Sequence, residues 1–417
     1  MRSEAEEVST GGPRVTPGAS PERGGLPDMT LFAAILALVA LVGTLLVAPR
    51  MARVRRLAPD PADLHAPPVA VVVAARNEEQ TIEPALRSLL DGVGPQTRVV
   101  VVDDRSTDGT PGILAALRGE YERLHSIRVD TLPEGWLGKS HALERGAEAA
   151  GEVDWILFTD ADVVFAPGAV ERVVRYAAER ELDHLTGGPS IRTGSFVLAG
   201  MIAAFGVLFG LFTQPWRAPV PGNRSAVGIG ALNLVRRRSY LEAGGHAALR
   251  MCVIDDLGLG RLMKSAGGRS EFVYASALIN IEWYPSLGSM MSGLVKNAFA
   301  GVDFRLTVVL GATAFIGLLL IAPFILPWVP GVSPLARGLS AFAGLLHLRA
   351  AWTAARRSDL PAATAALFPV GLTLFLITLW RSTLTALFTR KVVWRGTAYP
   401  LSSLIAACEA APWRRFR

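Results

Sequence analysis

Two acidic segments of the chain each follow an apolar run that is typical of a buried strand. Residues 99–110 read VVVVDDRSTDGT, and residues 155–162 read WILFTDAD, which ends in Asp160 and Asp162. Two carboxylates one residue apart, just past a strand, can face a common hard cation such as Mg²⁺ or Mn²⁺, whose other positions go to water and substrate phosphates. A lone Asp-x-Asp is more often a solvated turn. Two acidic strand ends in one sheet favour a metal site instead.

A third acidic pair opens a helical pattern. Residues 254–267 read IDDLGLGRLMKSAG, in which the apolar residues after the two aspartates recur at helical spacing. Asp255 and Asp256 therefore fall at or just before the first helical turn, where the helix dipole favours their ionised form. An ionised carboxylate is suited to accept a proton from an acceptor hydroxyl. The alternative is an N-cap aspartate with no chemical role.

The region that must position these carboxylates alternates between strand-like and helix-like apolar patterns. Strands are predicted over residues 69–74, 98–102, 126–131 and 155–159. Helices are predicted from Ile82 to Gly92, from an N-cap at Thr110, and over 140–150. This alternation predicts an α/β fold with a doubly wound, mostly parallel sheet. Such sheets bind ligands at the carboxyl ends of their strands.

Five short motifs occur in an order that resembles the inverting glycosyltransferases of family 2, which have a GT-A fold. They are ARNE at 75–78, VDDRSTDGT at 102–110, GWLGK at 135–139, DAD at 160–162 and DDLGLGR at 255–261. The resemblance covers roughly residues 69–297. Within the family, the GWLGK motif and the apolar C-terminal region most resemble the hopanoid-associated, carotenoid and ceramide glycosyltransferases, whose acceptors are lipids.

The resemblance implies a role for each residue that matches these motifs. Asp256 would be the catalytic base, with Asp255 beside it. Asp162 would hold a Mg²⁺ or Mn²⁺ ion, and Asp160 would contact the donor ribose or a metal-bound water, or share the ion. The residues implied to bind the nucleotide-sugar donor are Ala75, Arg76, Glu78, Asp104, Lys139, Asp160, Gly230 and Asn233. Lys139 would pair with the nucleotide or its diphosphate.

These roles imply inverting, metal-dependent transfer of a sugar from a nucleotide-sugar donor to a lipid or isoprenoid acceptor. The chain departs from the family in two places. Asp255 stands where the family more often has Glu, and the Gln-x-x-Arg-Trp motif of processive polysaccharide synthases is absent from residues 292–299. The absence favours addition of one sugar over polymerisation, with a processive synthase as the alternative.

Apolar runs organise the rest of the chain. Residues 1–28 are predicted to be a disordered tail, and residues 29–50 a transmembrane helix. Arginines crowd the end of this helix, so the positive-inside rule places the following domain, predicted over 66–300, in the cytosol. A C-terminal transmembrane region of two to three spans is predicted over 305–390, and a basic tail over 391–417. The protein is thus expected to be a multi-pass protein of the inner cell membrane.

The apolar stretch 195–213 is nearly long enough to span a membrane. If it crossed, Asp162 and Asp256 would lie on opposite sides, so it is predicted to be an interfacial helix. Further stretches lie at 306–328, 335–353 and 362–387. Three crossings would leave the arginine-rich tail outside, so one of the three is expected not to cross.

Composition excludes several other classes of protein. The net charge of +6 comes largely from arginines beside apolar runs, which fits lipid headgroups better than nucleic acid. Two isolated cysteines give no disulfide framework. A hydride-transferring Rossmann enzyme is disfavoured because no Gly-x-Gly-x-x-Gly motif follows the first strand. A transporter is disfavoured because 306–328 contains no ionisable residue. A catalytically dead lipid-binding scaffold is disfavoured because the whole acidic set is present.

Overall fold

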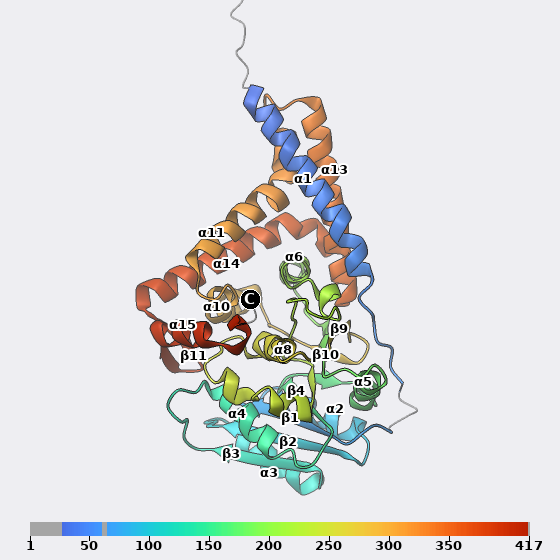
Figure 1. The fold of residues 1–417 in the computed structure, drawn as a ribbon, viewed down its shortest axis with the longest axis vertical. Coiled ribbons are helices and arrows are strands. Elements are labelled where there is room, and N and C mark those ends of the chain that lie inside the picture. The colour runs from blue at the N-terminus through green and yellow to red at the C-terminus, as the bar shows by residue number, and fades with distance from the viewer. Residues whose placement is uncertain (1–26, 61–64, 416–417) are drawn as a thin grey trace, which may run out of the picture.

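The computed structural model describes residues 27–60 and 65–415, which form an α/β domain joined to a set of long apolar helices (Figure 1). The tail predicted over 1–28 lies outside the described residues except for its last two positions. Those positions begin helix α1 (Pro27–Ala52), which was predicted over 29–50 and extends along the longest axis of the molecule. The α/β domain therefore lies at one end of α1.

A mixed sheet of seven strands forms the centre of the domain, in the order β3-β2-β1-β4-β8-β6-β9. The strands are β1 (Val69–Ala75), β2 (Thr97–Asp104), β3 (Leu124–Val129), β4 (Trp155–Asp160), β6 (His184–Gly188), β8 (Asn233–Arg236) and β9 (Ser270–Tyr274). The first four in the spatial order are parallel, and β8 runs antiparallel to both of its neighbours. The mostly parallel sheet predicted from the sequence is confirmed.

Apolar residues alternate between the two faces of this sheet, as the period of a strand requires. Val71 and Val73 of β1 pack in one buried cluster, whereas Ala70 and Val72 pack in another. The first cluster contains residues of α2 (Ile82–Gly92), α3 (Thr110–Glu120) and α5 (Ala169–Glu179), and the second contains residues of α4 (Gly138–Glu148) and α8 (Asp255–Ser265). Helices on both faces leave the carboxyl ends of the parallel strands as the place for a site.

The expected N-cap at Thr110 is wrong by one residue. The cap position of α3 is Gly109, and Thr110 is the first residue of the helix. The Thr110 hydroxyl instead accepts a hydrogen bond from the backbone N–H of Glu78, 2.9 Å away. Contact with another loop has therefore replaced the local capping interaction.

A second, three-stranded sheet holds the turn that follows β4. Strand β5 (Val164–Phe165) begins two residues after Asp162 and pairs with β10 (Ile279–Ile281). Strand β10 also pairs with β7 (Ser190–Ile191), which precedes helix α6 (Phe196–Thr213). Pairing on this sheet fixes where the Asp-x-Asp turn lies relative to α6. The short helices α7 (Arg237–Glu242), α9 (Leu287–Gly293) and α10 (Val295–Gly301) complete the domain.

Four helical segments in the described part of the chain are long and apolar enough to cross a membrane: Thr30–Ala52, Phe196–Arg217, Leu306–Trp328 and Ala362–Thr389. The third contains α11 (Leu306–Phe315), a π-helical segment and α12 (Ala322–Ile325), and the fourth contains α14 (Phe368–Thr389). The expected stretch at 335–353 is helix α13 (Pro334–Arg357), which packs along α1 but is not among these four. Figure 1 shows α6 nearly end-on while α1 runs up the picture, so α6 lies across α1.

The last segment of the chain, which the sequence suggested only as a basic tail, has regular structure up to Arg415. Strands β11 (Lys391–Trp394) and β12 (Thr397–Pro400) form a hairpin, and helix α15 (Leu401–Ala410) follows it. The hairpin and α15 lie beside α10 and close to α4 (Figure 1). Trp394 and Tyr399 are buried there in one cluster with Phe299 of α10.

Candidate active site

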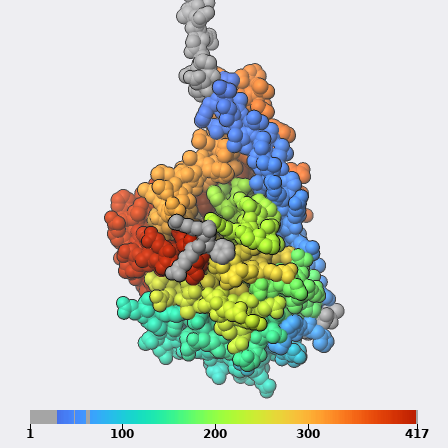
Figure 2. Space-filling view, viewed as in Figure 1, coloured from blue at the N-terminus to red at the C-terminus, as the bar shows by residue number. Residues whose placement is uncertain are grey.

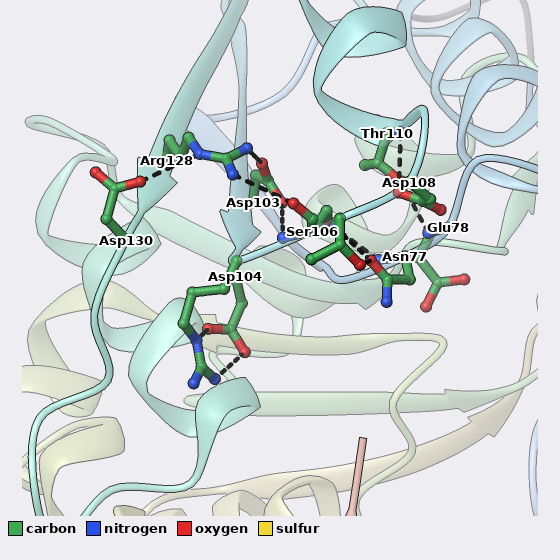
Figure 3. Close-up of polar contacts among 11 residues, drawn as sticks. Asn77, Glu78, Asp103, Asp104, Ser106, Asp108, Thr110, Arg128 and Asp130 are labelled. Carbon is green, nitrogen blue, oxygen red and sulfur yellow. Dashed lines mark hydrogen bonds and ion pairs between the residues drawn. The ribbon is translucent and has the colours of Figure 1, made fainter. Parts of the chain in front are cut away.

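The loops after β1 and β2 are joined by hydrogen bonds that use most of their polar groups (Figure 3). The Asn77 N–H donates to the Ser106 hydroxyl at 2.9 Å, and the Asn77 side-chain oxygen accepts from the Thr107 N–H at 2.8 Å. Asn77 has a left-handed backbone (φ 54°), which Asn tolerates better than most residues. Much of the VDDRSTDGT motif therefore serves to hold two loops together. We call residues 76–79 and 105–110 the paired loops.

The two adjacent aspartates of that motif have different partners. Asp103 accepts from the Ser106 N–H at 3.0 Å and pairs with Arg128 at 2.7 Å, so it closes its own loop. Asp104, predicted to contact the nucleotide, is buried and pairs with Arg105 at 2.7 Å. Arg76, predicted for the same role, approaches the other oxygen of Asp104 at 3.7 Å. Asp104 and Arg76 therefore lie together at the end of β2.

Helix α4 begins against these residues because its first position is glycine. A side chain on Gly138 would collide with the carboxylate of Asp104. The close approach carries the next residue, Lys139, to the centre of the site. Its Nζ lies 2.7 Å from Asp160 Oδ1 and 3.2 Å from Asp255 Oδ2. Lys139 thus joins the end of β4, which precedes α6 in the chain, to the start of α8, which follows it. These two acidic segments were expected from the sequence to share one site.

Asp256 is held at the edge of the same pocket. Its Oδ1 accepts from the Leu257 N–H at 2.7 Å and its Oδ2 from the Gly230 N–H at 3.2 Å. A side chain at Gly230 would collide with Asp160, so glycine allows the Asp160 and Asp256 carboxylates to share this backbone segment. Lys139, Asp160, Gly230, Asp255 and Asp256 all line one pocket. The predicted residues on either side of α6 are therefore brought together.

The charges in this pocket are unequally compensated. Burial opposes ionisation of Asp160, but the charge and hydrogen bond of Lys139 outweigh it and lower its pKa. Burial, followed by the charges of Asp160 and Glu78, raises the pKa of Asp162 to about 7. Burial and the charge of Asp255 raise the pKa of Asp256 to about 6. The expectation that the helix start would favour the ionised form of Asp256 is thus opposed by burial and by its neighbour.

Two predicted donor-binding residues have contacts within the protein. Asn233 is buried, and its amide nitrogen donates to the backbone oxygen of Asp256 at 3.2 Å. Its side-chain oxygen lies 2.7 Å from Nε2 of buried His184, so Nε2 is the protonated nitrogen in a consistent network. The Ala75 side chain is packed in the buried cluster between the sheet and helices α2, α3 and α5. Asn233 supports Asp256, and the Ala75 side chain does not face the pocket.

The carboxylates fit a divalent cation only if the donor supplies further ligands. Within residues 27–60 and 65–415, no cluster of three or more His, Cys, Asp or Glu side chains is placed to hold a metal ion. Mg²⁺ commonly takes one or two protein carboxylates and fills its other positions with water and phosphate. Asp160 pairs with Lys139, whereas Asp162 makes no ion pair with another described residue. Asp162, with its raised pKa, is therefore the carboxylate that a cation would stabilise most.

Two residues near this site, Tyr284 and Arg395, were not expected there from the sequence, and a third, Lys296, was expected to contact a lipid headgroup rather than a diphosphate. Burial, followed by the charges of Asp162 and Asp160, raises the pKa of Tyr284, which lies beyond α6 in the chain, to about 12. Arg395 and Lys296 both contribute to the low pKa of Asp160. Arg395 had a detectable signal: residues 391–394 and 397–400 (KVVW and TAYP) are rich in strand-forming residues and flank a two-residue Arg-Gly turn. Tyr284 had none.

Comparison with known proteins assigns the domain. Residues 70–240 match the family described as Glycosyl transferase family 2. The 4,4'-diaponeurosporenoate glycosyltransferases of Staphylococcus aureus strains MRSA252 and USA300 are each 29% identical to this chain over 194 residues, 46% of this chain and 50% of theirs. This chain therefore spans about half the length of the curated relatives it matches.

The fold has a solved counterpart. A mannosyltransferase from Pyrobaculum calidifontis, solved in complex with GDP-Man and Mn²⁺, superposes with a TM-score of 0.52 at 19% identity. The match covers 87% of this chain and 99% of that one, so it includes long helices as well as the sheet. At this identity the match concerns the fold alone. Residues 70–240 therefore match glycosyltransferase family 2, in a chain with the GT-A fold and helices suited to a membrane.

Proposed function

We propose that this protein transfers one sugar from a nucleotide-sugar donor to a lipid acceptor at the cytosolic face of the inner membrane, with inversion at the sugar. One observation carries the proposal: Lys139 joins Asp160 and Asp255 by ion pairs of 2.7 Å and 3.2 Å, with Asp256 in the same pocket. The motif suited to a cation and the motif suited to a base thus share one cavity. The similarity to carotenoid glycosyltransferases supports a lipid acceptor.

The donor diphosphate has a natural place beside Asp162. A Mg²⁺ or Mn²⁺ ion bound by Asp162 and the donor phosphates would offset the negative charge of the departing nucleoside diphosphate. The Mn²⁺ and GDP-Man bound to the Pyrobaculum counterpart support such a donor and cation. Lys139 already balances two carboxylates, so its charge would be shared with the phosphates. Asp104 and Arg76 remain the proposed contacts of the nucleoside.

Asp256 is the proposed general base. A pKa of about 6 leaves its carboxylate mostly ionised at pH 7 but basic enough to accept a proton, which is the range where general bases are most effective. The hydrogen bonds from Leu257 and Gly230 fix its orientation. Proton transfer to Asp256 as the acceptor oxygen attacks the face opposite the leaving group gives inversion in one step.

The C-terminal hairpin supports a specific membrane topology. Residues 391–415 contact the α/β domain, as in the 2.5 Å ion pair between Arg395 and Glu78, so they lie on the same side of a membrane as the domain. An even number of helical segments between domain and hairpin must then cross. The ends of α1 and α13 are tied by hydrogen bonds, Thr30 to Gly331 at one end and Arg357 to Met51 at the other. We infer that Leu306–Trp328 and α13 cross beside α1.

Because the number of crossings between the domain and the hairpin is even, helix α14 does not cross the membrane. It packs against α6, which lies across α1, and the exposed Arg381 near its middle would be costly in a membrane interior. We infer that α6 and α14 lie together at the membrane surface, as expected for 195–213. Arg349 of α13 lies about 12 Å from the end of that helix, close enough for a long side chain to reach the headgroups.

The activity is tested with the purified full chain in lipid nanodiscs. A panel of radiolabelled nucleotide sugars is supplied with Mn²⁺ and a total lipid extract, and label is counted in the organic phase. We expect one donor to label a lipid by a single sugar, as mass spectrometry would show, and Asp256→Asn to remove the signal. Label in long polymers would instead indicate a processive synthase, and no transfer from any donor would refute the proposal.

The topology is tested by labelling single cysteines in intact cells, in a background with Cys252 and Cys408 replaced by serine. Cysteines at Glu152, before α6, and at Arg238, after it, should both be protected from a membrane-impermeant reagent. A cysteine at Pro330, between the two proposed crossings, should be labelled. Labelling of only one of the first two positions would mean that α6 crosses the membrane.

A further inference from the structure

The tip of the β11–β12 hairpin contacts the paired loops of the donor site. Arg395 donates from Nη1 to the backbone oxygen of Arg76, and its Nη2 lies 2.5 Å from Glu78 Oε1. These partners are more than 300 positions apart in the chain. Because residues 391–400 lie outside the matched region 70–240, the family match alone does not assign them a role.

The hairpin is built to hold this position. Its two turn residues, Arg395 (φ 45°) and Gly396 (φ 79°), have the left-handed backbone of a tight turn that suits the twist of paired strands. Trp394 and Tyr399 are buried in one cluster with Leu137, which immediately precedes the start of α4. Figure 2 shows the C-terminal segment (red) wedged against the α/β domain beneath the long helices. The hairpin and the helix that carries Lys139 therefore pack as one unit.

A second cation lies beneath the hairpin. Nζ of Lys296, on α10, lies 4.2 Å from the centre of the Trp394 ring. Among the residues that the structure describes, no carboxylate forms an ion pair with it. Burial, then the positive charges of Lys139 and Arg395, lower the pKa of Lys296 to about 8. A half-buried ammonium group that faces two other cations, with no carboxylate within ion-pair distance, is a site that a polyanion would stabilise.

The position of these cations matches one part of a nucleotide-sugar. Arg395 touches the paired loops at Arg76 and Glu78, where the nucleoside is proposed to bind, and both cations act on the charge of Asp160. Arg395 therefore lies at the nucleoside end, and both cations lie within electrostatic reach of the acidic end of the site. The indole N–H of buried Trp394 also has no hydrogen-bond partner among the described residues. A diphosphate is the part of the donor that joins these two ends.

We propose that Lys296 and Arg395 bind the donor diphosphate, so that the membrane region and the C-terminal hairpin complete a donor site that the family 2 domain alone leaves open. This inference rests on the proposed function. On binding, Arg395 would share its N–H donors between the paired loops and phosphate, and Lys296 would gain an anionic partner within ion-pair distance. Both residues would also act on the leaving diphosphate, where added positive charge favours departure.

The test compares diphosphate with monophosphate affinity. Calorimetry on the full chain with excess Mn²⁺ measures the Kd of UDP, UMP, GDP and GMP, and the nucleoside bound by the wild type is then used. Lys296→Gln and Arg395→Gln should each weaken diphosphate binding about tenfold, the usual worth of a charge-assisted contact, and change monophosphate binding less than about twofold. Lys296→Arg, which keeps the charge, should retain most of the affinity.

Lys391→Gln provides the matched control, because Lys391 is an exposed cation on the same hairpin and is away from its tip. It should leave both affinities unchanged. Equal losses of diphosphate and monophosphate affinity would show that Arg395 and Lys296 only hold the loops in place, and unchanged affinities in both variants would also overturn the inference. Neither result would contradict the proposed function, because neither concerns whether the wild type transfers sugar. A wild type that bound no nucleoside diphosphate would overturn the proposed function as well.

Discussion

The candidate site has two halves, the paired loops and the pocket around Lys139, and the negative charges of their carboxylates are compensated in different ways. In the paired loops, burial opposes ionisation of Asp108, but hydrogen bonds with the Thr110 side chain and from the Thr110 and Glu79 N–H groups outweigh it and lower the pKa of Asp108. Around the second half, burial and neighbouring carboxylates raise the pKa of Asp162 to about 7 and of Asp256 to about 6. The first half is satisfied without a ligand, whereas the second holds negative charge that a cation or a proton must relieve.

This difference separates the residues that hold the loops in position from the residues that are suited to catalysis. Polar groups that already have partners can position a ligand but gain little from titration or metal binding. Strongly perturbed carboxylates in a cleft are candidates for catalysis. Mutations in the first half should therefore act mainly on stability, and mutations in the second half on turnover and on dependence on metal.

The largest effect is expected at the proposed base. Asp256→Asn keeps the size of the side chain but cannot accept a proton, so turnover should fall by roughly 10²- to 10⁴-fold. Donor affinity should change little, because the base faces the acceptor. Steady-state kinetics with the lipid acceptor measure both. Asp255→Asn should lose less turnover, and the reverse order would show that the base is Asp255.

A smaller but distinct effect is expected at Asp162. Asp162→Asn removes a strongly perturbed carboxylate at the proposed cation site, one with no ion-pair partner among the described residues, so the gain in donor affinity on adding Mn²⁺ should drop by about tenfold or more. Calorimetry with and without EDTA measures this gain. Asp108→Asn serves as the control in the paired loops and should keep the full response to Mn²⁺. Equal donor affinity in EDTA and in Mn²⁺ for the wild type would contradict the metal assignment.

In the paired loops, the expected effect is on folding. Asn77→Ala removes the acceptor for the Thr107 N–H and places a less tolerant residue at φ 54°, which together should destabilise the protein by about 2 kcal/mol. Thermal unfolding in detergent, followed by tryptophan fluorescence, reports the change. Asn77→Gly tolerates the backbone and loses only the hydrogen bond, so it should be the milder variant. An unshifted Tm for both would mean that the paired loops contribute no stability.

The buried network under Asp256 predicts a weaker, pH-dependent effect. Burial lowers the pKa of His184 to about 4, from 6.5 in an unfolded chain. The unfolded state therefore binds more protons between these values, so this stability is fully present above pH 6.5 and is lost as the pH falls toward 4. At pH 5 the loss should reach about 2 kcal/mol, seen as a lower Tm than at pH 7.5.

His184→Gln can keep a hydrogen bond to Asn233 and should reduce this acid sensitivity. Some should remain, because burial also lowers the pKa of His246, to about 3. An identical fall in Tm between pH 7.5 and pH 5 in the wild type and in His184→Gln would assign the acid sensitivity to other groups.

Much of the sheet and its helices could be predicted because their signals are local. Buried strands β1, β2 and β4 each appear as a run of apolar residues, and α2 ends where Gly92 was expected to end it. The partners of individual side chains were harder to predict. Thr110 was expected to cap its own helix, yet its hydroxyl bonds the Glu78 N–H across 32 positions. A hydroxyl or carboxylate can satisfy a near or a distant donor, and only packing decides which.

The sequence by itself determined the order of elements, the acidic motifs and the need for both sides of α6 to share one site. Each of these depends on periodicity or on neighbouring residues. The tertiary structure alone decided that Lys139 joins Asp160 to Asp255, that residues 391–400 return to the donor site, and that Lys296 lies beneath them without a carboxylate. These contacts join segments that are about 20 to 320 positions apart, and a sequence carries no local mark of such pairings because long-range packing selects them.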